Sequence, residues 1–334
     1  MFVRQINSII NEYIKLSPNS KVSIGVINKN DKIAYNFDFN GITNIEYEYQ
    51  TGSVSKTFTA HLVMKYINLN VIDINENVGY YLDLESDEYP TIYELLTHTS
   101  GYTRFVIKKH VIQQFFIKRY EKNIYENIDN EYILRVLKKK KRSRKYNYAY
   151  SDFNYAVLAL VLEKVCKRSY IELLNEFIKE DLKLNNTHLL NEYVPNTIGN
   201  KGKKICNNWL WKSNNPYIVA GGICSNLTDM MKYLELQIEA KKDYIKDCHQ
   251  VNTNTKKRKD KLLICMGWHA NKNANHLWHL GGVGCYKTAV IVSKKRKIGV
   301  VVMTNCYDFN VPSHHHLAKM IYGLLSRNKK ILEE

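Results

Sequence analysis

Residues 51–58 read TGSVSKTF and place a serine and a lysine three positions apart. In a helix, side chains at this spacing lie on one face, a single turn from each other. A serine hydroxyl is a weak nucleophile until a base lies close, and the Lys56 amine can be that base or steady another. If Ser53 lies in the first helical turn, unpaired backbone N–H groups there can bind a developing oxyanion. The alternative is a helix cap at Ser53 with Lys56 exposed to solvent.

A second stretch, residues 150–155, reads YSDFNY and opens a predicted helix over 152–166. A phenol beside an ammonium ionises more readily, because the positive charge favours phenolate. Tyr150 could then act as a general base at neutral pH. The alternative is that Ser151 or Asp152 caps the helix and Tyr150 is simply buried.

A third stretch, residues 278–284, reads WHLGGVG and lies between strand-like runs. Closely spaced glycines let the backbone approach a ligand or another strand. An edge strand here could bind the backbone of a substrate, with His279 donating or accepting a hydrogen bond. The alternative is a glycine-rich hairpin turn.

Strand-like patterns lie near both ends of the chain, and helical patterns dominate the middle. The predicted strands are 22–27, 32–37, 262–269, 277–281, 286–292 and 298–304. The predicted helices are 3–16, 53–69, 92–97, 110–120, 130–138, 152–166, 169–179, 226–240 and 312–326. We therefore predict an α+β fold, in which early and late strands pair in one antiparallel sheet flanked by the terminal helices.

The same order predicts two lobes. Residues 1–70 and 215–334 would form the α/β sheet domain, and residues 71–214 a mostly helical lobe. A cleft between lobes is a common place for a ligand site.

The chain has 334 residues and a formal net charge of +17, which fits an anionic partner or, more simply, a lysine-rich surface. Seven cysteines, an odd number without a C-x-x-C pair, predict neither a disulfide framework nor a zinc site. The first residues lack the apolar core and cleavage site of a signal peptide, and no run approaches the ~18 apolar residues of a membrane span. These features predict a cytoplasmic protein without a transmembrane segment.

Together the three stretches resemble the serine β-lactamase and penicillin-binding-protein superfamily, which carries S-x-x-K, then Y-x-N, then K-T-G or H-x-G. The tyrosine and the histidine variant resemble its class C β-lactamase, DD-peptidase and esterase branch. Three further segments match that branch: ELLTHTSG at 94–101, AGGICS at 220–225 followed by Asp229, and GVVVMTN at 299–305. The resemblance extends from about residue 20 to residue 325.

The resemblance implies a serine hydrolase that acts through an acyl-Ser53 intermediate on a small-molecule or peptide substrate. Lys56 would assist Ser53, and Tyr150 would be the base and later the acid. The backbone N–H groups of Ser53 and Gly282 would form the oxyanion hole. The resemblance implies no cofactor and no metal, and no specific nucleic-acid partner.

Three substrate-contacting positions follow from the same resemblance, and two depart from its pattern. Asp152 stands where the pattern has Asn, and a carboxylate cannot donate a hydrogen bond to a substrate carbonyl. It also adds negative charge near Lys56. The segment from His279 to Gly281 replaces K-T-G and removes a charge and a hydroxyl that suit a β-lactam carboxylate. Both changes favour an ester, an amide or a D-amino-acid peptide as the substrate over a β-lactam.

Two basic runs, 138–145 and 256–259, are predicted to be solvated loops, and the first is a candidate site for an anionic partner. Residues 314–316 are all histidine, but adjacent residues on a helix point apart, so we expect no metal site there. Two alternatives to hydrolysis remain: an acyltransferase or cyclase on the same acyl-enzyme, and a non-catalytic binding protein that kept the fold.

Overall fold

The structure is a computed structural model, and it describes residues 2–85, 88–103, 122–139, 148–190, 194–251, 262–271, 276–308 and 311–327. The predicted helix 110–120, the basic run 256–259 and residues 140–145 of the other basic run lie outside the described residues. Within them, the prediction of an α+β fold with one large antiparallel sheet is confirmed.

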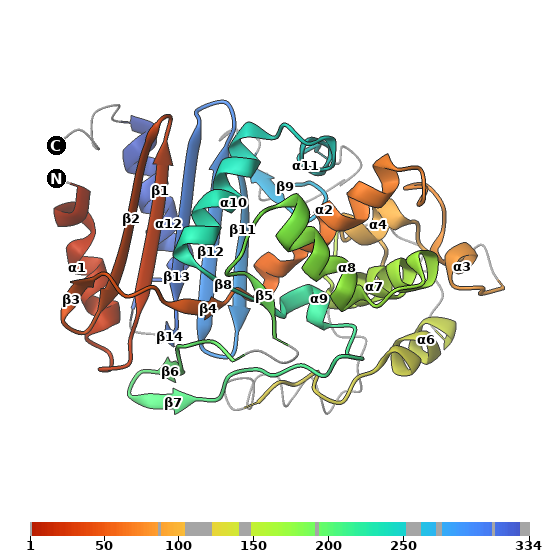
Figure 1. Ribbon diagram of the computed structural model, residues 1–334, viewed down its shortest axis with the longest axis horizontal. Helices are drawn as coiled ribbons and strands as arrows, with labels where there is room; N and C mark the ends of the chain where they lie inside the picture. Colours follow the sequence, from red (N-terminus) through yellow and green to blue (C-terminus); the bar gives the residue numbers. More distant parts are fainter. Residues whose placement is uncertain are drawn as a thin grey trace.

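The frame of the described molecule is an eight-stranded antiparallel sheet (Figure 1). The first long strand of the chain pairs on one side with its own hairpin partner and on the other with a strand from the far end of the sequence. In spatial order the strands are β3 (Gly41–Thr43), β2 (Asp31–Asp38), β1 (Val22–Asn28), β13 (Ile298–Thr304), β12 (Tyr286–Ser293), β11 (His276–Val283), β10 (His269–Asn271) and β9 (Leu262–Ile264).

Two small three-stranded sheets stand beside the large one. The first has the order β4 (Glu48–Gln50), β8 (Ile223–Asn226), β5 (His188–Leu189), and the second has the order β14 (Cys306–Tyr307), β6 (Gly199–Lys201), β7 (Lys204–Cys206). The pairing of β4 with β8 holds the chain in place immediately before residues 51–58.

The helices described are α1 (Phe2–Ile14), α2 (Ser55–Asn68), α3 (Val78–Tyr81), α4 (Ile92–Leu96), α6 (Asn130–Lys139), α7 (Asp152–Cys166), α8 (Tyr170–Glu176), α9 (Ile218–Gly221), α10 (Leu227–Glu239), α11 (Asp243–Cys248) and α12 (His314–Arg327). A 3-10 turn, η1 (Gly52–Val54), precedes α2, and a π-helical turn, η2 (Phe177–Asp181), follows α8. A bilayer-spanning segment would need a long apolar helix, and none of the helices in the described ranges meets that need.

Both faces of the large sheet are covered, which explains why its central strands β1 and β13 are buried along their whole length. Val300 and Val302 of β13 point to a core shared with α1 and α12. Their neighbours Val301 and Met303 point to the opposite core, shared with α10, since side chains alternate along a strand. Figure 1 shows α10 across one face of the sheet and α12 behind the other.

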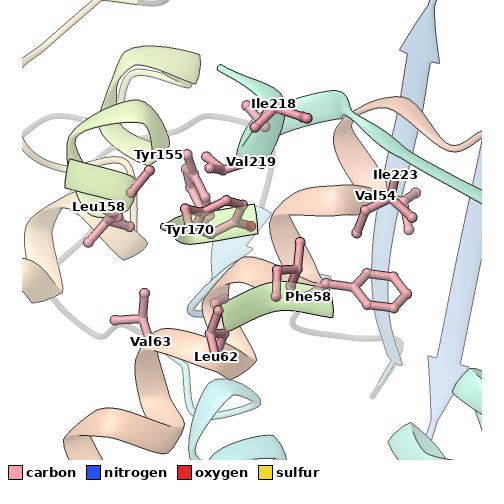
Figure 2. Close-up of a cluster of buried hydrophobic side chains, with 14 of the residues drawn as sticks. Val54, Phe58, Leu62, Val63, Tyr155, Leu158, Tyr170, Ile218, Val219 and Ile223 are labelled. Carbon is pink, nitrogen blue, oxygen red and sulfur yellow. The ribbon is translucent and has the colours of Figure 1, made fainter. Parts of the chain in front are cut away.

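The helix α2 lies in the centre of the larger core, and this burial fixes the position of the residues at its start. Phe58, Leu62 and Val63 of α2 are buried against α7, α8, α9 and β8 (Figure 2). Interiors of this kind are packed like organic crystals, so the helix has little freedom to shift. The packing therefore holds residues 53–56 where β8 and α9 meet the sheet.

Two predictions were wrong. Residues 262–269 form not one strand but β9 and β10, separated by a turn in which Gly267 has φ +76°. The chain also contains a disulfide between Cys206 and Cys285, whereas the odd number of cysteines predicted none. The partners are 79 positions apart, and no local spacing could indicate a pair that only the fold brings together.

Candidate active site

Ser53 lies in η1, directly before α2, and Lys56 lies one turn further on. The Lys56 ammonium donates to Ser53 Oγ at 3.1 Å and to the backbone oxygen of Ala220 at 2.8 Å. The Lys56 side chain is completely buried, so the alternative of a solvent-exposed lysine is wrong. A buried charge is stable only when it is paired and hydrogen-bonded.

The charge partner of Lys56 is Asp152, the residue that departs from the Y-x-N pattern. Lys56 Nζ and Asp152 Oδ1 are 2.7 Å apart, and the Asp152 side chain is 7% exposed. The other carboxylate oxygen accepts a hydrogen bond from the Tyr125 hydroxyl at 3.0 Å. Both oxygens of Asp152 therefore bind protein groups, and a structural role in holding Lys56 follows directly from the geometry.

Tyr150 approaches the same ammonium from another side. The centre of its ring is 5.1 Å from Lys56 Nζ and 4.5 Å from the ring centre of His98. Ser151 is the N-cap of α7, because its side chain accepts from Asn154 N, and its own N–H donates to His98 Nδ1. Capping by Ser151 and proximity of Tyr150 to Lys56 are thus compatible, although the sequence presented them as alternatives.

The backbone of β11 lies directly against the turn that carries Ser53. An ideal Cβ on Gly281 would lie 1.8 Å from the carbonyl oxygen of Thr51, and one on Gly52 would lie 2.5 Å from Gly282 N. Gly52 also has φ +56°, a conformation that favours glycine. Only glycine fits at these positions, and this explains the glycines in both motifs.

The backbone nitrogen of Gly282 lies beside this turn, since an ideal Cβ on Gly52 would lie 2.5 Å from it. A two-residue turn joins β11 to β12, so Val283 and Tyr286 form a hydrogen-bonded pair. The next pair, Gly282 and Lys287, is a non-hydrogen-bonded pair, in which the backbone groups point away from the partner strand. Gly282 N–H therefore points away from β12, and β10 pairs with β11 only further back along the strand. This orientation suits a donor that acts together with the N–H of Ser53.

His279 is buried on β11 beside the rings of Tyr150 and His269. Burial, and then the proximity of His269 and Lys56, lower the pKa of His279 well below its usual value. Its Nδ1 lies 3.0 Å from the Leu280 carbonyl oxygen. His279 is therefore a neutral hydrogen-bonding group at neutral pH, not a substitute for the positive charge of a lysine.

These groups border a pocket of about 430 Å³. It is lined by Ser53, Tyr150, Trp209, His269, Trp278, His279, Leu280, Gly281, Gly282, Gly284, Lys287, Tyr307 and His314. Of the histidine run, His314 lines the pocket, whereas His315 stacks on Trp278 outside it. Among the residues that the structure describes, no group of three or more His, Cys, Asp or Glu could hold a metal ion.

Four contributors were not identified in the sequence: Tyr125, Trp209, His269 and the backbone oxygen of Ala220. Tyr125 and Trp209 come from segments without a quoted motif, His269 ends the strand predicted over 262–269, and Ala220 begins the AGGICS segment. In the fold, Tyr125 binds Asp152 and the Ala220 oxygen binds Lys56, whereas Trp209 and His269 line the pocket that contains Ser53. His98, which accepts from Ser151, lies within the ELLTHTSG segment that resembles the family, but no role in the site was predicted for it.

A sequence profile of the family described as Beta-lactamase matches residues 48–320, which include every part of this site. The chain belongs to the β-lactamase family. Among its relatives is "Protein flp" of Staphylococcus aureus (strain N315), 20% identical over 285 residues, or 79% of this chain and 54% of that protein. The chain spans about half the length of the curated relatives it matches.

Solved structures show that the β-lactamase family fold extends over the whole chain. An octameric penicillin-binding protein homologue from Pyrococcus abyssi superposes with a TM-score of 0.77 and 21% identity, covering 99% of this chain and 79% of the other. A class C β-lactamase from Rhodobacter sphaeroides superposes with a TM-score of 0.76 and 16% identity, covering 98% of both. At these identities the likeness concerns the fold and not the substrate.

Proposed function

We propose that this protein is a serine hydrolase that cleaves an ester or amide through an acyl-Ser53 intermediate. The observation that carries the proposal is the contact of 3.1 Å between Ser53 Oγ and the buried ammonium of Lys56, at the wall of a pocket that also contains Tyr150. Acyl transfer through a serine requires a base and a charge that supports it close to the hydroxyl, and Tyr150 and Lys56 are the candidates for these two roles.

The roles follow from the charges around Ser53. Lys56 forms an ion pair with Asp152, so it acts as a cation that steadies Tyr150 and not as the base itself. Tyr150 takes the proton of Ser53 as the hydroxyl attacks the carbonyl carbon, and then gives a proton to the leaving oxygen or nitrogen. Water hydrolyses the resulting ester and restores the Ser53 hydroxyl.

Backbone donors would stabilise the charge that develops on the carbonyl oxygen. The N–H groups of Ser53 in η1 and Gly282 in β11 would act together there, and the close contact of Gly281 with Thr51 supports this proposal. Loss of one such donor typically costs ~10²–10³ in rate. Beyond β10, the second edge of β11 pairs with no strand of the described residues, and it would bind the substrate backbone.

The substrate class is narrowed by the two departures from the family pattern. Asp152 uses its oxygens on Lys56 and Tyr125, so it offers no amide donor to a substrate carbonyl. The neutral His279 offers no fixed charge to a β-lactam carboxylate. These observations favour simple esters, amides and D-amino-acid peptides over β-lactams.

The test is a substrate panel run beside Ser53→Ala. We expect hydrolysis of a small ester or a D-peptide by the native chain, a loss of at least about 10³-fold in Ser53→Ala, and slow or no turnover of β-lactams. An added amine acceptor separates hydrolysis from acyl transfer, because an amide product would then appear. Equal rates for the native chain and Ser53→Ala would contradict the proposal.

A further inference from the structure

The pocket that holds Ser53 continues around the edge of β11 onto the other face of the sheet. His279 and Gly281 face the Ser53 side, whereas Trp278 and Leu280 belong to the opposite face, packed near α12. The pocket is lined by all four, so it has a catalytic end and a second end beside the start of α12.

Lys287 of β12 stands at this second end. An ideal Cβ on Gly282 would lie 3.3 Å from Lys287 Nζ, so the ammonium sits over the exposed face of the proposed oxyanion donor. The same ammonium lies 4.8 Å from the centre of the Tyr307 ring and 3.5 Å from the Gly284 carbonyl oxygen. These contacts hold the Lys287 ammonium at the pocket wall, which Gly284 and Tyr307 also line.

The other groups at this end also favour an anion. α12 begins at His314 and has no acidic residue in its first turn, so the positive end of its dipole faces the pocket uncompensated by its own side chains. His314 Nε2 is buried and has no hydrogen-bond partner among the described residues. Burial lowers the pKa of His314 to about 3, so this ring is neutral and can donate one hydrogen bond.

The lining of the whole pocket contains no Asp or Glu among the residues that the structure describes. The charge of Lys56 is balanced by Asp152 behind the catalytic end. At the second end, the described lining therefore contributes the positive charge of Lys287 and the positive end of α12, and no carboxylate.

We propose that Lys287 is a specificity-determining residue that binds a carboxylate on the substrate, away from the scissile bond. The inference rests on the proposed function and narrows its substrate class to anionic esters or amides. The site lies on the opposite face of β11 from His279, where the family pattern places its own cation. His314 and the first turn of α12 would donate hydrogen bonds to the same carboxylate.

Two matched pairs of esters test the proposal. Mono-p-nitrophenyl glutarate and p-nitrophenyl pentanoate differ by a carboxylate on the acyl side, and 4-acetoxybenzoate and 4-acetoxybenzamide differ by one on the leaving-group side. A hydrogen bond between charged groups contributes about 1.5–3 kcal/mol, or roughly 10–150-fold. We expect Lys287→Met to lower kcat/KM for the anionic ester of at least one pair by about tenfold or more, and to change its neutral partner less than about threefold.

Lys295→Met is the matched control, since Lys295 is an exposed lysine in the turn that follows the same strand. We expect it to leave both esters unchanged, and Lys287→Arg to keep the preference. The proposal would be overturned if Lys287→Met lowered kcat/KM equally for the charged and neutral esters of both pairs, or lowered it for neither. If no ester is cleaved in a Ser53-dependent way, the proposed function fails, and calorimetry of glutarate on the native chain and Lys287→Met then tests the carboxylate site alone.

Discussion

Asp152→Asn removes the negative charge beside Lys56 and keeps nearly the same shape. At 2.7 Å and an effective dielectric constant of about 20, the attraction between the two charges is roughly 6 kcal/mol before desolvation is counted. Removal of one partner of a buried ion pair typically costs about 3–5 kcal/mol, because the other charge stays buried without its partner. The new amide oxygen can still accept from Lys56, so we expect a loss near 3 kcal/mol in the free energy of unfolding.

A double-mutant cycle measures the pair itself. The free energy of unfolding is measured in guanidinium for the native chain, Asp152→Asn, Lys56→Met and the double variant. We expect the loss in the double variant to be smaller than the sum of the two single losses by at least about 2 kcal/mol. The exposed pair Glu180–Lys183, with side chains 68% and 72% exposed, is the control, and Glu180→Gln with Lys183→Met should give a coupling below about 0.5 kcal/mol. Additive losses at residues 56 and 152, within about 0.5 kcal/mol, would show that the two charges do not stabilise each other.

Three further predictions concern the surroundings of the site. Gly281→Ala would place a Cβ 1.8 Å from the Thr51 backbone oxygen, so we expect a loss of about 1–3 kcal/mol in thermal or chemical unfolding and a loss of ester hydrolysis, and an unchanged enzyme would contradict this packing. The disulfide Cys206–Cys285 joins positions 79 residues apart, and its replacement by two serines should cost about 2–4 kcal/mol, with dithiothreitol destabilising the native chain but not the variant. His279 has a lowered pKa, so below pH ~6.5 the unfolded chain binds a proton that the folded chain does not. The free energy of unfolding therefore decreases as the pH is lowered, by up to about 1.4 kcal/mol per pH unit. His279→Asn should reduce this slope between pH 7 and 5, and an unchanged slope would argue against a buried neutral ring.

The parts of the structure that depend on local pattern could be predicted from the sequence. Alternation and apolar runs predicted β1, β12 and β13, and their antiparallel arrangement is confirmed. The S-x-x-K spacing predicted that Ser53 and Lys56 share a helical face, and they are in contact.

Features that depend on distant segments could not be predicted in this way. Tyr125 reaches Asp152 across 27 positions, and no periodicity links them. Lys287 was one of many lysines in the sequence, and only the β11–β12 hairpin places it over Gly282. Gly267, in contrast, was a visible turn signal within the strand predicted over 262–269, and greater weight on glycine would have divided that strand.

The nucleophilic character of Ser53 is tested most directly by a fluorophosphonate probe with intact-mass and peptide-level mass spectrometry. We expect one adduct per chain, located on the peptide that contains Ser53 and absent in Ser53→Ala. The adduct should be retained in Ser55→Ala, because the Ser55 hydroxyl accepts from the backbone N–H of Ile223 and does not line the pocket. A folded native chain that gains no adduct, or gains it at another residue, would show that Ser53 is not the nucleophile.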